Sequence, residues 1–74
     1  MSEVAAPSAK ERLKRAKLRE IEAHRRAIDV HENIGHFFES VGLDAQAAAV
    51  RKRAEFTREK MEVAIREAEA LSIE

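Results

Sequence analysis

Glycine and proline, the two residues that most often end a helix, occupy only three positions in this chain of 74 residues. Proline is Pro7, and the two glycines are Gly35 and Gly42. Neither residue type occurs after Gly42, and between Pro7 and Gly42 only Gly35 interrupts the sequence. This distribution predicts two long helices joined by one short turn.

The sequence around these positions indicates where each helix begins and ends. Ser8 and Glu11 form a capping box, in which each side chain accepts a hydrogen bond from the backbone amide of the other residue. Gly42 suits the left-handed conformation that closes a helix, and Asp44 suits the cap of the next helix. We therefore expect a disordered tail over residues 1–7 and one domain over residues 8–74, with helices over about 9–41 and 45–72.

The second predicted helix carries a single apolar seam with the spacing of a coiled coil. Steps of four and three residues alternate along it without a slip. This seam, here called the Ala54 seam, consists of Leu43, Ala47, Val50, Ala54, Thr57, Met61, Ala64, Ala68 and Leu71. Its alanines allow a neighbouring helix to approach closely, and we expect Ala47, Val50, Ala54 and Met61 to contact the first helix.

The first predicted helix has a wider apolar surface that contains two overlapping seams. The Val30 seam consists of Leu13, Ala16, Glu20, Ala23, Ala27, Val30, Ile34, Phe37 and Val41. The Ile28 seam, one residue along, consists of Ile21, His24, Ile28, His31, Gly35 and Phe38. A surface of this width can contact two partners at once. We expect Val30, Ile34 and Phe37 to pack on the second helix, which leaves the Ile28 seam for another molecule.

A lone hairpin of two helices buries too little apolar surface to be comfortably stable. We therefore predict an all-α fold in which two antiparallel hairpins associate as a homodimeric four-helix bundle. Phe56 and Val63 support this prediction, because they lie nearly opposite the Ala54 seam. The predicted interface between the two copies consists of Ile21, His24, Ile28, His31, Phe38, Phe56 and Val63.

Fourteen basic and fourteen acidic residues cancel overall but are distributed in blocks. Residues 10–26 carry eight basic and three acidic side chains, whereas residues 29–44 carry four acidic ones and no Lys or Arg. Residues 51–60 carry five basic and two acidic side chains, and residues 62–74 carry four acidic and one basic. Folding the chain at Gly42 places each basic block beside an acidic block, so the pattern favours antiparallel pairing.

Composition argues against several classes of protein. The absence of cysteine excludes disulfides, thiolate metal sites and a cysteine nucleophile. Neutral overall charge argues against a dedicated nucleic-acid binder, and no apolar run suits a membrane span or a signal peptide. Catalytic triads, phosphate-binding glycine loops and metal-binding motifs are also missing. We expect a soluble protein of the bacterial cytoplasm that has no catalytic residue, metal or cofactor.

Six residues around the predicted turn fall at the spacings of the signature residues of a tetratricopeptide repeat. They are Ile34, Gly35, Phe38, Gly42, Ala47 and Ala54. The resemblance covers residues 28–56. It implies a single repeat-like pair of antiparallel helices that serves as a scaffold for protein binding.

The run from Ala27 to His36 is similar to the phosphoacceptor box of bacterial sensor histidine kinases. In that family an Ala-x-Glu-Leu-His-Asp-x-x-Gly-His/Gln pattern lies on the first helix of a dimeric hairpin. The resemblance implies that His31 is the phosphorylated imidazole and that Glu32 helps to take up its proton. It therefore implies an alternative function, that of a histidine phosphotransfer and dimerisation module.

The histidines also have interpretations that need no family. His24 and His31 lie seven residues apart, and the simplest interpretation is that both pack in a helix interface. A histidine in such a seam can also change charge near neutral pH and act as a switch. The spacing of Glu20 with His24, and of Glu32 with His36, permits a two-ligand metal site on the helix surface.

These observations favour a small non-catalytic interaction or adaptor protein that binds itself or another, unidentified protein. A nucleic-acid-binding accessory protein is a further alternative, in which the basic run from Lys10 to Arg19 contacts phosphates. Two features argue against nucleic acid as a partner. The run is predicted to lie beside the acidic end of the second helix, and no aromatic residue within it is available to stack on bases.

Overall fold

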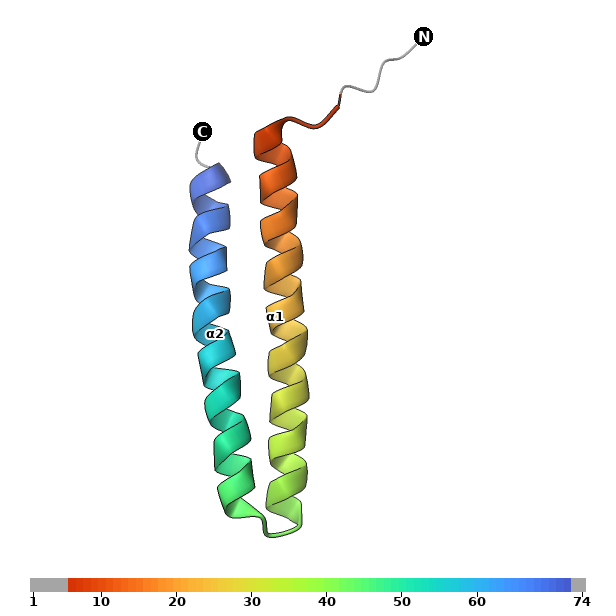
Figure 1. The fold of residues 1–74 in the computed structure, drawn as a ribbon, viewed down its shortest axis with the longest axis vertical. Helices are drawn as coiled ribbons and strands as arrows, with labels where there is room; N and C mark the ends of the chain where they lie inside the picture. The colour runs from red at the N-terminus through yellow and green to blue at the C-terminus, as the bar shows by residue number, and fades with distance from the viewer. Residues whose placement is uncertain (1–5, 73–74) are drawn as a thin grey trace.

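The computed structural model describes residues 6–72 and consists of two helices joined by a tight turn. The helices, α1 (Ala9–Ser40) and α2 (Asp44–Ser72), run antiparallel and side by side along their whole length (Figure 1). The predicted all-α hairpin is therefore confirmed, and the helix ends fall within one residue of those expected. The predicted tail lies outside the described residues over positions 1–5, and residues 6–8 precede α1 without helical structure.

The capping box forms at the start of α1. The Glu11 amide donates to Ser8 Oγ at 3.1 Å, and the Ser8 amide donates to Glu11 Oε1 at 3.0 Å. The hydrogen bond from the Ser8 backbone lowers the pKa of Glu11, because that bond favours the ionised carboxylate. The sequence around Ser8 thus sets the first residue of the helix.

Gly42 closes α1 and starts the turn. Its φ of 80° is in the left-handed region, which suits glycine because it has no Cβ to clash. The amides of Gly42 and Leu43 donate to the carbonyls of Glu39 and Phe38, a pattern known as the Schellman motif. Asp44 is the first residue of α2 rather than the residue before it, and its carboxylate lies in the first turn, where the helix dipole favours negative charge.

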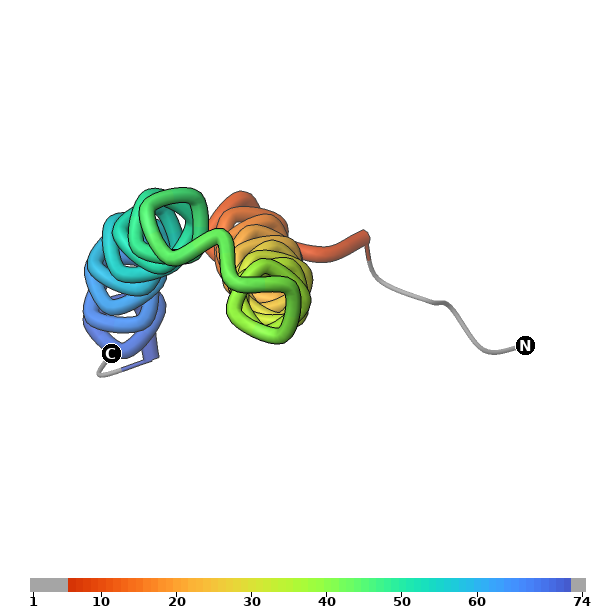
Figure 2. Tube along the Cα trace, turned by 90° about the horizontal axis from the view of Figure 1, so that it is seen from below, coloured from red at the N-terminus to blue at the C-terminus, as the bar shows by residue number. Residues whose placement is uncertain are grey.

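α2 contacts α1 through the Ala54 seam. Four of its alanines are the buried residues of α2, namely Ala47, Ala54, Ala64 and Ala68. Val50 and Met61 lie half-buried on the same side. Because these side chains are short, they allow the two helices to approach closely. The view from below shows that the two helices are inclined to each other (Figure 2).

On α1 the two seams have the opposite roles from those predicted. Ile21 and Ile28 are buried against α2, whereas Val30, Ile34 and Phe37 are 54%, 38% and 59% exposed. The assignment of Val30, Ile34 and Phe37 to the contact between the helices is therefore corrected. The hairpin uses the Ile28 seam instead, with His24, His31 and Phe38 half-buried at its edge.

The charged residues explain this choice. On a helix, Glu32 and Glu39 lie diametrically opposite the Val30 seam, so packing that seam on α2 would point both carboxylates away from α2. With the Ile28 seam on α2, Glu32 and Glu39 instead reach Arg58 and Arg51. Both seams satisfy the heptad spacing, but only the Ile28 seam also allows these ion pairs.

Substitution of the two glycines by alanine should have opposite effects on the free energy of unfolding. Gly42→Ala places a Cβ at positive φ and should cost about 1–2 kcal/mol. Gly35→Ala should stabilise by up to about 1 kcal/mol, because its Cβ would meet Arg51 Cγ at an ordinary 3.5 Å and alanine favours the helix. Urea unfolding followed by circular dichroism measures both values, and a Gly42→Ala variant as stable as wild type would contradict the turn assignment.

Candidate functional site

One broad face of the hairpin is polar and is held by two ion pairs between the helices. Arg58 Nη2 lies 2.9 Å from Glu32 Oε2. Arg51 pairs with Glu39 about two helical turns closer to the loop. The hydrogen bond from Arg51 lowers the pKa of Glu39. A shallow groove on this face is lined by Glu32, His36, Arg51, Ala54, Glu55, Arg58, Glu59 and Glu62.

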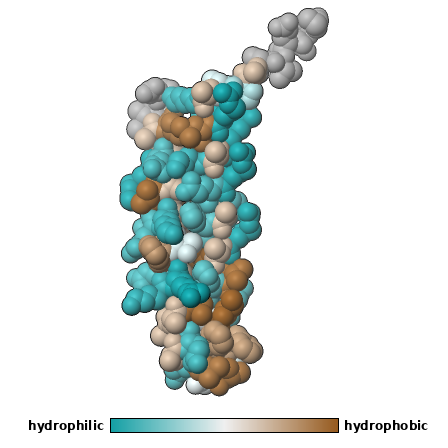
Figure 3. Space-filling view, in the orientation of Figure 1, coloured by the Kyte–Doolittle hydropathy of each residue, from teal (hydrophilic) through white to brown (hydrophobic). Residues whose placement is uncertain are grey.

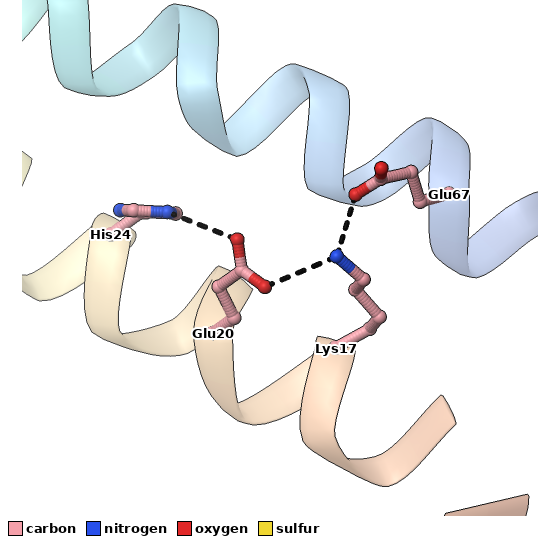
Figure 4. A network of polar contacts seen from close by, with 4 residues as sticks. All are labelled: Lys17, Glu20, His24 and Glu67. Carbon is pink, nitrogen blue, oxygen red and sulfur yellow. Dashed lines mark hydrogen bonds and ion pairs between the residues drawn. The ribbon is translucent and has the colours of Figure 1, made fainter. Parts of the chain in front are cut away.

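The opposite face has a polar network near the free ends of the helices (Figure 4). Lys17 Nζ lies 2.6 Å from Glu67 Oε1 on α2 and 3.4 Å from Glu20 Oε1 on its own helix. The hydrogen bond to Glu67 raises the pKa of Lys17, because the carboxylate favours the charged amine. Glu20 also approaches His24, with 3.5 Å between Glu20 Oε2 and His24 Nε2.

The ion pairs between the helices follow the charge blocks of the sequence. Lys17 and Glu67 join the basic start of α1 to the acidic end of α2. The pairs of Glu32 and Glu39 join the acidic end of α1 to the basic start of α2. Exposed pairs of this kind contribute little stability individually. Each of them joins a basic block to an acidic block, and together they favour the antiparallel arrangement over a parallel one.

The Val30 seam is exposed along α1 and forms the main apolar surface of the hairpin. Its large side chains are between 38% and 59% exposed, and they are Leu13, Val30, Ile34, Phe37 and Val41. Hydrophobic surface gathers over α1 near the turn in the space-filling view (Figure 3). An apolar stripe at heptad spacing, interrupted here only by Glu20, is typical of a surface that another helix covers.

Phe56 and Val63 of α2 lie on the same side of the hairpin as the Val30 seam. Glu20 of this seam contacts Lys17, and Lys17 contacts Glu67 on α2, so Glu67 lies on the same side of the hairpin as the seam (Figure 4). Val63 precedes Glu67 by one helical turn, and Phe56 precedes Val63 by two. Both side chains are exposed, at 59% for Phe56 and 45% for Val63. Lys60 Nζ lies 4.7 Å from the centre of the Phe56 ring.

The residues predicted for an interface between copies fall into two groups. Phe56 and Val63 are exposed, and their place in an interface between copies stays a prediction. The other five face α2 within the hairpin, and they are Ile21, His24, Ile28, His31 and Phe38. The sequence predicted that the Ile28 seam would be exposed, whereas the exposed surface of α1 is the Val30 seam. The signal that identifies it is the position of Glu32 and Glu39 on the opposite side of the helix.

His31 and His36 occupy different environments. His31 lies half-buried in the Ile28 seam, and its Nδ1 is buried with no hydrogen-bond partner among the described residues. His36 is exposed, with Nδ1 3.7 Å from Glu39. The carboxylate of Glu32, the expected proton acceptor beside His31, is paired with Arg58. Within residues 6–72, no three side chains of His, Asp or Glu come together in a way that could hold a metal ion.

No family model matches this chain, and comparisons with curated proteins and with solved structures likewise gave no significant match. The resemblances to the tetratricopeptide repeat and to the histidine-kinase box therefore stay predictions from their motifs. In the described part of the chain, neither helix combines the length and the apolar character needed to cross a membrane.

The ion pairs and the capping box predict that stability falls at both ends of the pH range. Glu39 and Glu11 have lowered pKa values when folded, so their contribution is present above about pH 4.5 and is lost as the pH falls further. Lys17 has a raised pKa, so its contribution is present below about pH 10.5 and is lost above it. The melting temperature should be highest between these limits.

A single substitution tests how much of the stability lost at low pH comes from protonation of Glu39. Glu39→Gln should lower the melting temperature at pH 7 and reduce its further loss between pH 5 and 3, because the titrating carboxylate has been removed. Thermal melts across this range check the expectation. Identical pH profiles for wild type and Glu39→Gln would show that the pair with Arg51 contributes nothing.

Proposed function

We propose that this chain is a small, non-catalytic interaction protein that self-associates through the Val30 seam. The observation that carries the proposal is the exposure of Val30, Ile34, Phe37 and Val41 after the hairpin has formed. These four side chains continue one heptad pattern along α1 and end at the turn. Such a stripe matches a helical docking surface, which presents apolar anchors at intervals of three and four residues.

The thin core of the hairpin also supports the proposal. Its buried apolar residues in the described part of the chain are four alanines together with Ile21 and Ile28. A core of this size offers few large side chains to offset the conformational entropy lost on folding. Burial of the Val30 seam against another helix would supply the missing apolar contact.

The polar side chains fit an interaction protein better than an enzyme. The carboxylates of Glu32, Glu39 and Glu67 each pair with a cation of the other helix. His24 contacts Glu20 of its own helix. These groups join the two helices to each other along the rod and do not converge on a common point in a cavity.

Sedimentation of matched variants tests the proposal. Wild type should have about twice the chain mass of 8.4 kDa. Phe37→Glu should abolish association, because it puts a charge in the middle of the apolar stripe. Leu18→Glu is the matched control, since Leu18 is 51% exposed but lies outside the Val30 seam, and it should leave the mass unchanged.

Two outcomes would overturn this function. A wild-type mass of one chain at tens of micromolar would exclude self-association through any surface at that concentration. A Phe37→Glu variant that keeps the full mass would show that association uses another surface. Circular dichroism on the same samples reports whether each variant is still helical.

A further inference from the structure

We infer that the molecule covering the Val30 seam is a second copy of this chain, bound antiparallel about a twofold axis that passes beside Ala27. This inference rests on the proposed function and specifies the orientation and register of the assembly. Ala27 is the central residue of the seam, with four seam residues on either side. The arrangement brings α1 of one copy against α1 of the other.

Reversing the seam about Ala27 gives four pairs of residues, and two of them place a small residue opposite a large one; the other two are Leu13 with Val41 and Glu20 with Ile34. Ala16 then lies opposite Phe37 of the second copy, and Ala23 lies opposite Val30. Ala27 meets its own equivalent at the axis, where two small side chains allow close approach. In the two pairs of a small with a large residue, the large side chain can fill the space left by the alanine.

One charged pair of α1 beside the axis favours the same orientation. Residues 10–26 are strongly basic and residues 29–44 are acidic. Among the acidic side chains of the second half, Asp29 flanks the Val30 seam, whereas Glu32 and Glu39 lie on the far side of α1 and pair with Arg58 and Arg51. Next to the axis, Arg26 of one copy lies level with Asp29 of the second copy, and both flank the seam on the same side.

α2 gives an independent indication of where the axis lies. Ile21 packs among Ala64 and Ala68, and Glu32 pairs with Arg58, so Ala27 lies level with about residue 62 of α2. The midpoint between Phe56 and Val63 lies within about one helical turn of this level. A twofold axis there brings Phe56 of one copy to Val63 of the other, so the exposed apolar side chains of both helices are consistent with one axis.

The same axis also pairs the charge blocks of α2. Residues 51–60 are basic and residues 62–74 are acidic, with the change of sign close to the level of the axis. Reversing α2 about that level places the basic block of one copy beside the acidic block of the other. A face-to-face dimer therefore brings opposite charge blocks of α2 to the same level, while Arg51 and Arg58 of the basic block stay paired with Glu39 and Glu32 on the polar face.

Disulfide trapping tests the register in a chain that has no cysteine of its own. Ala27→Cys should form a covalent dimer on mild oxidation, since the two thiols meet at the axis within the range that a disulfide spans. Ala48→Cys is the matched control on the polar face, where Ala48 is exposed, and it should stay unlinked.

The ends of the seam distinguish antiparallel from parallel helices. Val41→Cys alone should not link to itself, because an antiparallel pair separates the two positions by about 40 Å. A mixture of Leu13→Cys and Val41→Cys chains should link to each other. Self-linking of Val41→Cys would indicate a parallel pair and overturn the inference.

The other face-to-face arrangement places α1 of one copy on α2 of the other. Ala23 would then lie near Val63 of the second copy, and Ala27 would be far from its equivalent. Linking in a mixture of Ala23→Cys and Val63→Cys chains, without linking of Ala27→Cys, would overturn the inference while the proposed self-association stands. A monomeric wild type would instead remove the proposed function itself.

Discussion

The close contact between the alanines of α2 and the Ile28 seam of α1 is the interaction on which the rest of the structure depends. Ala47, Ala54, Ala64 and Ala68 let the helices approach closely over their whole length. The contact is long but thin, since alanine buries little apolar area. It gives the hairpin a defined register and leaves the larger apolar side chains on the outside, where they are available to another molecule.

Charge then determines which surface of α1 is covered and which is left exposed. Heptad spacing alone allows either seam to face α2. The ion pairs of Glu32 and Glu39 with arginines of α2 require the Ile28 seam, so the Val30 seam is left exposed. Each pair is weak by itself, but all of them favour the same face of α1.

Much of the fold followed from the sequence, because its signals are local. Gly42 and the capping box of Ser8 and Glu11 set the helix ends to within one residue. The choice of seam on α1 was predicted incorrectly, because apolar spacing was considered without the position of Glu32 and Glu39 around the helix. Side-chain contacts such as that of Lys17 with Glu67 depend on the register between the helices, which only the folded hairpin defines.

The central claim is that the hairpin reaches its stable form by covering the Val30 seam with a second copy. The dependence of the melting temperature on protein concentration tests it most directly, because association stabilises a folded dimer by mass action. Circular dichroism at 222 nm suits a chain that has neither tryptophan nor tyrosine. We predict a melting temperature that rises steadily as the concentration increases from one to several hundred micromolar, whereas a constant melting temperature would contradict the claim.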